Sequence, residues 1–345
     1  MKLQRFIRHR EVLVLLILVI LIMLVGMINP SFLQTATLLS ILNTSLILVL
    51  VSIGETFVIL TRGIDVSVGA SMGISAVILG VSLNAGFPLG VAIIFALLTG
   101  MIAGLINGIG VSVFKVPPII MTLGTLGTYR GLMLIITGGS WIETIPQNIK
   151  SLAGLKFLNI SLFAWITFAI VAGMAFLLQR VKQARYFYAV GDNEEGAYLL
   201  GVPVKKTLLL AYTLAGLFAG VASVIFVGQI GFVPMQTGNG LELRAIAASV
   251  LGGVNLAGGV GSPVSALVGG VFLTVIDSIL VFLKVPAFWN DAIAGLILLI
   301  VVLIDYRVRV SIDAQQRRTR AQVRAQKMQA SHQELQELNE RKEEK

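Results

Sequence analysis

The chain has 345 residues, of which 56% are hydrophobic and 12% are charged, and its formal net charge is +9. Soluble domains carry about 25% charged residues, so this composition excludes an ordinary soluble domain, and the mean hydropathy of +0.92 agrees. With 0 cysteines, disulfides, thiol nucleophiles and cysteine-ligated metals are excluded as well. The histidines, His9 and His332, lie in the charged termini, which argues against a histidine-based catalytic or metal centre inside the membrane.

Apolar runs recur along the whole chain, and each is close to the roughly 20 residues that a helix needs to cross a hydrocarbon core. They predict an all-α polytopic membrane protein with about ten transmembrane helices. The first run follows a basic segment, as in a signal peptide, but it is too long for one and no small-residue cleavage site follows, so we predict a retained helix. The predicted spans are 12–29, 38–61, 67–84, 88–113, 117–137, 160–180, 206–229, 240–257, 261–284 and 288–305.

The distribution of basic residues predicts the side of the membrane on which each loop lies. An even number of spans places both termini on one side. With the termini inside, 21 of the 26 Lys and Arg lie inside, 3 lie outside and 2 lie within spans. Such an excess marks the cytoplasmic side, and it explains the positive charge without nucleic acid as a partner. The predicted parts are a cytoplasmic N-terminal segment 1–11, a transmembrane domain 12–305, a cytoplasmic loop 181–205 within it, and a cytoplasmic charged tail 306–345.

Glycine is abundant, with 36 residues, and several glycines recur at helical spacing within the predicted spans. In lipid, helices gain little by burying apolar surface against one another, so close backbone approach at small residues supplies the contact energy. We therefore predict helix packing, and not a ligand site, for Gly100, Gly104 and Gly108 of the fourth span and for Gly216 and Gly220 of the seventh.

Two pairs of short segments indicate an internal repeat. "GIDVSVGAS" from Gly63 resembles "GLELRAIAAS" from Gly240, and "KVPPII" from Lys115 resembles "KVPAFW" from Lys284. In the predicted topology the first member of each pair begins inside and the second begins outside. This is the behaviour of an inverted repeat, which is common in transport proteins.

The sequence motifs of enzymes are missing. The chain has no G-x-x-x-x-G-K-[ST] phosphate loop, no Ser-His-Asp set and no H-E-x-x-H. We therefore predict a transport protein that is not an enzyme, without catalytic residues, metal or cofactor of its own.

Polar residues within the spans are the remaining candidates for a solute path. An ionisable residue in hydrocarbon costs about 2.5–3.5 kcal/mol on insertion scales, so each needs a reason. Asp277 is the deepest acidic residue, and the sequence supports a helix–helix hydrogen bond and a pore-lining role for it equally. The sequence does not identify the path among Glu55, Arg130, Glu242, Arg244, Asp291 and the uncharged Asn43, Asn107, Thr122, Thr125, Thr128, Tyr129, Gln229, Gln236, Asn239 and Asn290.

The stretch "YFYAVGDNEEGAYLLGV" is a compact, partly acidic segment of the long cytoplasmic loop. Asp192 is a good N-cap with Glu195 three residues later, as in a capping box, and Gly201 fits a C′ position. Together they predict a helix of two turns, which is too short to be stable alone in water. Its apolar side, with Ala197 and Leu200, needs a surface to cover it. The residues alone leave open whether that surface is the protein's own face or a cytoplasmic partner.

Five ordered segments cover nearly the whole chain except the tail: "LTRGIDVSVG", "GLINGIGVSVFKVPPIIMTLGTLGTYRGL", "AVGDNEEGAYLLGV", "GNGLELRAIAASVLGGVNLAGGVGS" and "FWNDAIAGLILL". They resemble the permease subunits of ribose-type ATP-binding cassette (ABC) importers. Within that family, "QIGFVPMQTGNGLE" and "GGSWIE" are most similar to the branch that imports autoinducer-2. Gly196–Ala197 stands where many sugar permeases of the family carry an alanine pair, and this departure favours the same branch.

The resemblance implies a type II importer fold in the bacterial inner membrane and a small hydroxylated solute. It implies as partners two cytoplasmic ATPase subunits that bind the ATP, a second permease subunit that is a different chain, and a periplasmic solute-binding protein. It also makes the loop helix the coupling site to the ATPase, formed by Gly191, Asp192, Asn193, Glu195, Gly196, Ala197, Leu200 and Gly201. The alternatives are a permease for ribose or another sugar, and an ion-coupled secondary carrier.

Overall fold

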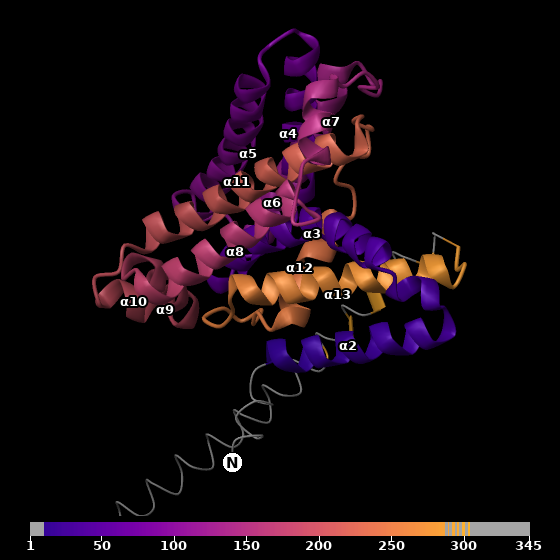
Figure 1. Cartoon of the computed structure of the whole chain (residues 1–345). Coiled ribbons are helices and arrows are strands. Elements are labelled where there is room, and N and C mark those ends of the chain that lie inside the picture. The colour runs from indigo at the N-terminus through magenta and orange to yellow at the C-terminus, as the bar shows by residue number, and fades with distance from the viewer. Residues whose placement is uncertain are drawn as a thin grey trace, which may run out of the picture. The chain divides into compact units, whose positions relative to one another are not determined.

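A computed structural model of the chain describes residues 10–286, together with residues 289, 292, 293, 295, 296, 299, 300 and 303. This part is built almost entirely of helices (Figure 1). The longer helices are α2 (Arg10–Ile28), α3 (Thr35–Leu60), α4 (Val68–Asn84), α5 (Leu89–Ser112), α6 (Pro118–Thr137), α8 (Leu162–Arg180), α11 (Val204–Ile230), α12 (Leu241–Gly252) and α13 (Pro263–Phe282). The short elements are η1 (Pro30–Leu33), α7 (Gln147–Gly154), η2 (Gln183–Arg185), α9 (Tyr186–Asp192), α10 (Glu194–Leu199) and the hairpin of β1 (Lys156–Phe157) and β2 (Ile160–Ser161).

The prediction of an all-α polytopic membrane protein is confirmed, whereas the count of ten spans is not. Among the described residues, 7 helices are long and apolar enough to cross a membrane. The eighth predicted span, 240–257, contains only α12, whose 12 residues extend about 18 Å, well short of a hydrocarbon core of roughly 30 Å. Gly253 ends α12 early because it takes a left-handed conformation, with φ 119°. The tenth predicted span, 288–305, lies mostly outside the described residues.

Proline and glycine set several helix ends as local chemistry requires. Pro118 and Pro263 occupy the first helical position of α6 and α13, where the missing N–H costs nothing. Gly138 and Gly231 end α6 and α11 in the left-handed conformation. The predicted N-terminal segment 1–11 and the tail 306–345 lie outside the described residues, except for residues 10 and 11.

The centre of the fold is a pair of helices, α3 and α11, that pack against each other and against most of the others. The second half of α3 is buried continuously from Leu48 to Leu60, and most of α11 is buried as well. By contrast, α2 exposes most of its leucine and isoleucine side chains. Because a helix that is apolar all round belongs either in a core or in lipid, α2 is a lipid-facing helix at the margin of the fold.

Helices α5 and α11 make the most extensive contact of the fold and lie side by side in Figure 1. A Cβ atom on Gly104 would overlap the backbone carbonyl oxygen of Tyr212, and one on Gly100 would overlap that of Gly216. Gly108 faces Leu209 and Gly220 faces Ala96 and Leu97 in the same contact. The two backbones therefore approach so closely that no side chain fits between them, which is how small residues stabilise helix pairs in lipid.

The members of one predicted repeat pair share a backbone feature, and the members of the other pair contact each other. Lys115 and Lys284, in the two Lys-Val-Pro segments, both adopt the left-handed conformation, with φ 58° and 57°, which is uncommon for a residue other than glycine. In the other pair, Gly69 packs against the backbone carbonyl of Gly238 and the carboxylate of Glu242. These features agree with an inverted repeat, which stays a prediction.

Candidate functional site

The loop between α8 and α11 contains two short helices and not the single two-turn helix that the sequence predicts. Helix α9 ends at Asp192, and α10 begins at Glu194. Asn193 between them is extended, with φ −157°, and its side-chain oxygen accepts a hydrogen bond of 2.9 Å from the Gly196 N–H. The predicted N-cap, Asp192, is therefore wrong by one residue, because Asp192 still belongs to α9. A capping box is absent from α10, since its third helical position is Gly196.

The other end of α10 follows the prediction. Gly201 has φ 78°, and its N–H donates to the Tyr198 carbonyl at 3.0 Å. The Val202 N–H donates to the Ala197 carbonyl, also at 3.0 Å. This pair of bonds is the Schellman motif, in which a glycine at C′ closes a helix. The predicted C′ role of Gly201 is confirmed, and the chain leaves α10 in a defined direction towards α11.

The apolar residues of α10 divide between two surroundings. Ala197 is 4% exposed and packs with Val190, Val204 and Leu208 in a small cluster that joins α9, α10 and α11. Tyr198, Leu199 and Leu200 are 72%, 78% and 86% exposed. We call these three residues the exposed ridge. Part of the loop is thus covered by the protein itself, and the ridge is left uncovered among the described residues.

Two backbone contacts hold α9 against the rest of the fold. A Cβ atom on Gly191 would overlap the Leu60 carbonyl oxygen at the end of α3. The same carbonyl accepts a hydrogen bond of 3.0 Å from the Gly259 N–H, in the loop between α12 and α13. Gly191 is therefore a residue of close packing, where three chain segments meet. Glycine is required at this position because any side chain would overlap the Leu60 carbonyl oxygen and break the contact.

Arg62 binds the same three segments together. Its guanidinium donates to the Asp192 carbonyl at 2.5 Å and to the Ala257 carbonyl at 2.8 Å. Arg62 lies two residues after the end of α3 and has φ 64°, so the chain turns there. The sequence reasoning missed this role and counted Arg62 only as a basic residue of the inside loops. The sequence did offer one signal for this role, since Arg62 stands between the end of a predicted span and Gly63.

Tyr188 fixes the other side of α9. Its hydroxyl donates to the Gly261 carbonyl at 2.9 Å. Burial raises the pKa of the Tyr188 phenol above its ordinary value, and the nearby carboxylate of Glu11 raises it further. The phenol therefore stays protonated and remains a donor at any physiological pH. Glu11 in turn accepts hydrogen bonds from Ser262 at 2.8 Å and Ser265 at 2.7 Å, at the start of α13.

A groove with a volume of about 730 Å³ runs beside α10. Its floor is apolar at Val202, Pro203 and Val204, and Tyr198 of the exposed ridge forms part of its wall. Lys115 crosses it to Glu194, with an Nζ to Oε1 distance of 3.4 Å. Glu195 and Asp192 are exposed. The loop therefore offers an apolar ridge, an adjoining apolar groove and several solvated charges, which together suit a protein partner better than a small molecule.

The two hydrogen bonds of the Arg62 guanidinium form what we call the Arg62 clamp. Removing it is expected to loosen the loop without unfolding the protein. In Arg62→Met both hydrogen bonds are lost, and a bond from a charged donor contributes about 1.5–3 kcal/mol. Amide hydrogen exchange over residues 186–199 should therefore speed up by at least about 10-fold, the factor that the loss of one such bond gives. The matched control is Lys115→Met, because this cation lies on the same surface but its exposed ion pair contributes only about 0–1 kcal/mol. Equal exchange in both variants would contradict the clamp.

The polar residues of the spans form two kinds of site. One is a buried network in which the Asn107 amide donates to Ser67 at 2.7 Å and to Asp65 at 3.3 Å, while Thr125 donates to Asn107 at 2.7 Å. It joins α5 and α6 to the turn before α4, and Asp65 N–H donates to the buried Glu55 at 3.1 Å. Such bonds between neighbouring helices support packing. Asn290 and Asp291 lie outside the described residues.

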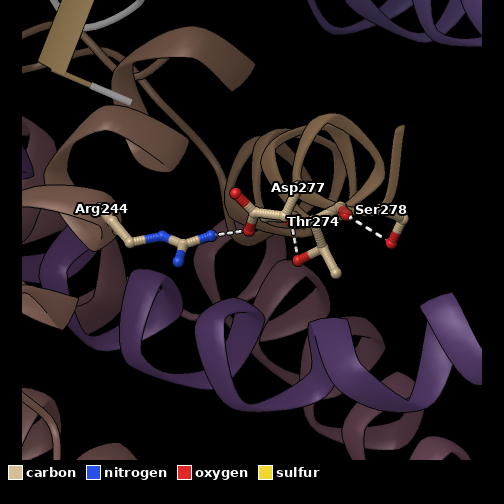
Figure 2. A network of polar contacts seen from close by, with 5 residues as sticks. Arg244, Thr274, Asp277 and Ser278 are labelled. Carbon is tan, nitrogen blue, oxygen red and sulfur yellow. Dashed lines mark hydrogen bonds and ion pairs between the residues drawn. The ribbon is translucent and has the colours of Figure 1, made fainter. Parts of the chain in front are cut away.

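The other kind of site borders a cavity. Asn43 and Gln229 line one of about 420 Å³, together with Lys150 and Ser161. Asn239, Arg244 and Asp277 line a second cavity, in which Arg244 of α12 makes an ion pair with Asp277 of α13 (Figure 2). Of the two roles that the sequence left open for Asp277, the structure shows the bond to another helix. Asp277 also borders a cavity, and its pore-lining role stays a prediction.

Comparison with known proteins agrees with this architecture. A family profile described as "branched-chain amino acid transport system / permease component" matches residues 37–302. The autoinducer 2 import system permease protein LsrC of Escherichia coli K12 is 47% identical over 315 residues, which cover 91% of this chain and 92% of that protein. The protein of the same name from Salmonella typhi is 46% identical, with 91% of each chain covered. No solved structure gives a significant match. The chain belongs to the family of branched-chain amino acid transport system permease components.

Proposed function

We propose that this chain is the membrane subunit of an ATP-driven importer for autoinducer-2 and that the loop carrying α9 and α10 docks the ATPase. A permease of this family is a multi-pass inner-membrane transport component. The observation that carries the docking proposal is the exposed ridge, because its three large apolar side chains stand uncovered while Ala197 of the same helix packs against α9 and α11. Exposed apolar patches of this kind mark interaction sites.

The loop is suited to transmit force as well as to bind. Gly191, Arg62 and Tyr188 join it to the end of α3 and to the loop before α13. Displacement of α10 by a partner would therefore be passed to helices of the membrane domain, because tightly packed elements move as units. The charge distribution predicts that this loop lies on the cytoplasmic side, where ATP is available, and the sequence has no phosphate-loop motif. The motor therefore belongs to a separate ATPase subunit.

Autoinducer-2 is the proposed solute because relatives at 46–47% identity carry that name and match this chain over nearly their whole length. The resemblance of the loop and of the segment around Gly240 pointed to the same branch. We propose the complete importer as two permease subunits, this chain and a different one, with two ATPases and a periplasmic solute-binding protein. In this arrangement both termini of the chain lie in the cytoplasm.

Solute uptake tests the proposal directly. Cells that carry the complete importer should remove autoinducer-2 from the medium, and cells that lack only this chain should not. Ribose and leucine serve as competing solutes in parallel. If the importer takes up ribose or leucine and not autoinducer-2, the proposed solute is wrong. Import that survives deletion of the ATPase and collapses when the proton or sodium gradient is dissipated would show a secondary carrier and overturn the whole mechanism.

A further inference from the structure

We propose that the cavity bordered by the Arg244–Asp277 ion pair is a solute-binding site within the membrane domain, and that it takes a small, uncharged, polyhydroxylated molecule. We call it the ion-pair cavity. It has a volume of about 230 Å³ and lies among α3, α4, α11, α12 and α13. The choice of solute rests on the proposed function, but the position of the binding site does not.

The ion pair joins α12 to α13, but this link alone is a weak reason to place two charges in the membrane domain. Charged residues within transmembrane helices are costly, and they usually face the interior or a polar cavity and mark solute paths. A buried pair is also weak support for stability, because the desolvation of two charges offsets their attraction. Here the side chains of Arg244 and Asp277 are 26% and 24% exposed, and both border the ion-pair cavity. The pair is thus accessible to whatever occupies that space.

The size of the cavity suits a small solute. A water molecule occupies roughly 30 Å³ of liquid, so the cavity has the capacity of about eight waters. That is the volume of a molecule of roughly ten non-hydrogen atoms, such as a five- or six-carbon polyol.

The chemistry of the wall suits hydroxyl groups. Asp277 can accept hydrogen bonds from two neighbouring hydroxyls, and the Arg244 guanidinium can donate to hydroxyl oxygens. Thr44 and Asn239 add uncharged donors and acceptors, while Met72 and Phe226 supply apolar surface for the carbon skeleton. Because the two charges of the wall balance and already bind each other (Figure 2), an uncharged solute can bind without breaking the pair.

The backbone around Asn239 adds to this picture. Gly240 is the left-handed N-cap of α12, with φ 74°, and the residues Gly238, Asn239 and Leu241 border the cavity. Because Leu241 is the first residue of α12, the positive end of this helix lies at the cavity wall. Helix α12 is also short, with 12 residues. Short helices that begin inside the membrane domain and direct their ends at the solute are characteristic of transport sites.

The absence of cysteine from this chain allows a direct test. Single variants Asn239→Cys and Thr274→Cys place one thiol at the cavity wall, and Ser278→Cys places one on α13 outside it, where the native hydroxyl donates to the Thr274 carbonyl at 2.9 Å. Membranes holding the complete importer are treated with a small charged thiosulfonate, and labelling is measured on the purified permease chain. Autoinducer-2 at about ten times its dissociation constant should slow labelling of the two wall thiols about tenfold, and labelling of Ser278→Cys should not change.

The outcomes separate this inference from the proposed function. If autoinducer-2 is imported by the unmodified importer but protects neither wall thiol, the site is overturned. Failure of both wall thiols to react would overturn it too. If ribose protects them and autoinducer-2 does not, the site is supported and the proposed solute is wrong. Protection by leucine alone would also overturn the preference for an uncharged, hydroxylated solute.

Transport kinetics give a second measurement. Asp277→Asn and the double variant Arg244→Gln/Asp277→Asn should lower kcat/KM for uptake at least about tenfold, because the amide keeps only one acceptor oxygen and lacks the charge that strengthens hydrogen bonds from solute hydroxyls. Ser278→Ala is the matched control and should transport normally. The double variant removes both charges of the pair, so it guards against a failure of Asp277→Asn to fold. The amount of permease in the membrane and its co-purification with the ATPase should stay unchanged, and full transport by the double variant would contradict the proposal.

Discussion

Replacing Leu199 and Leu200 by aspartate is expected to abolish co-purification of the ATPase subunits and to stop solute import. Both leucines belong to the exposed ridge, at 78% and 86% exposure, so the change removes apolar contact surface without disturbing the packing of α10. Central apolar residues of an interface contribute about 2 kcal/mol or more each, a factor of roughly 30 in affinity. Two aspartates at such positions should therefore reduce binding below detection in a pull-down from membranes.

The matched control for this double variant is Leu158→Asp. Leu158 is 73% exposed in the turn between β1 and β2, a loop on the opposite side of the membrane in the predicted topology. Its left-handed conformation, with φ 51°, is one that aspartate tolerates. The control should keep both ATPase binding and import. Normal co-purification of the Leu199→Asp/Leu200→Asp variant would show that the ridge is not the docking surface.

The choice of positions depends on the structure. Substitution of Ala197 would also disrupt the loop, but Ala197 is buried against α11, so loss of binding could follow from local unfolding alone. Gly196 carries a similar ambiguity, because its N–H binds the cap side chain of Asn193. The exposed leucines separate docking from folding, and they are accordingly the stronger test.

Gly104→Val is expected to destabilise the membrane domain more than any other single change proposed for this chain. A Cβ atom at this position overlaps the Tyr212 carbonyl oxygen, and a backbone atom cannot move aside as a flexible side chain can. Forcing α5 and α11 apart should cost about 3 kcal/mol or more, at the upper end of overpacking effects. For a chain of this size we expect the midpoint of thermal unfolding in detergent to fall by roughly 5–10 °C.

Gly90→Val provides the control in the same helix. Gly90 is exposed near the start of α5, and a Cβ atom there meets no atom within 4 Å. Valine and glycine differ by only a few tenths of a kcal/mol in helix propensity, so the midpoint should move by no more than about 2 °C. If the two valine variants unfold at the same temperature, the close approach of α5 and α11 does not support the fold.

Local patterns in the chain were sufficient for much of the architecture. The apolar runs predicted nine of the described helices, and the glycines at helical spacing lie where α5 and α11 approach most closely. Gly201 closes α10 as predicted. Each of these features depends on residues within a few positions of one another, since helix length, capping and small-residue spacing are encoded in neighbouring residues.

Three features required the tertiary structure. Asp192 and Asn193 are equally good N-caps by sequence, and the choice between them follows from Arg62 and Gly191, which hold the end of α9 to segments distant in the chain. The length of α12 was overestimated because its apolar run continues past Gly253, where the backbone turns. The pairing of Arg244 with Asp277 joins residues on different helices, so no local pattern could indicate it.

The sequence by itself therefore determined the class of the protein, the order of its helices and the position of the loop that we propose as the coupling site. The tertiary structure decided which face of that loop is uncovered. Ala197 and Leu200 are both apolar and lie three residues apart, yet one packs against α11 and the other is left exposed. A side chain is buried only where another part of the chain lies against it. A helix of 6 residues is too short to cover its own side chains, so the surface that buries Ala197 comes from α9 and α11.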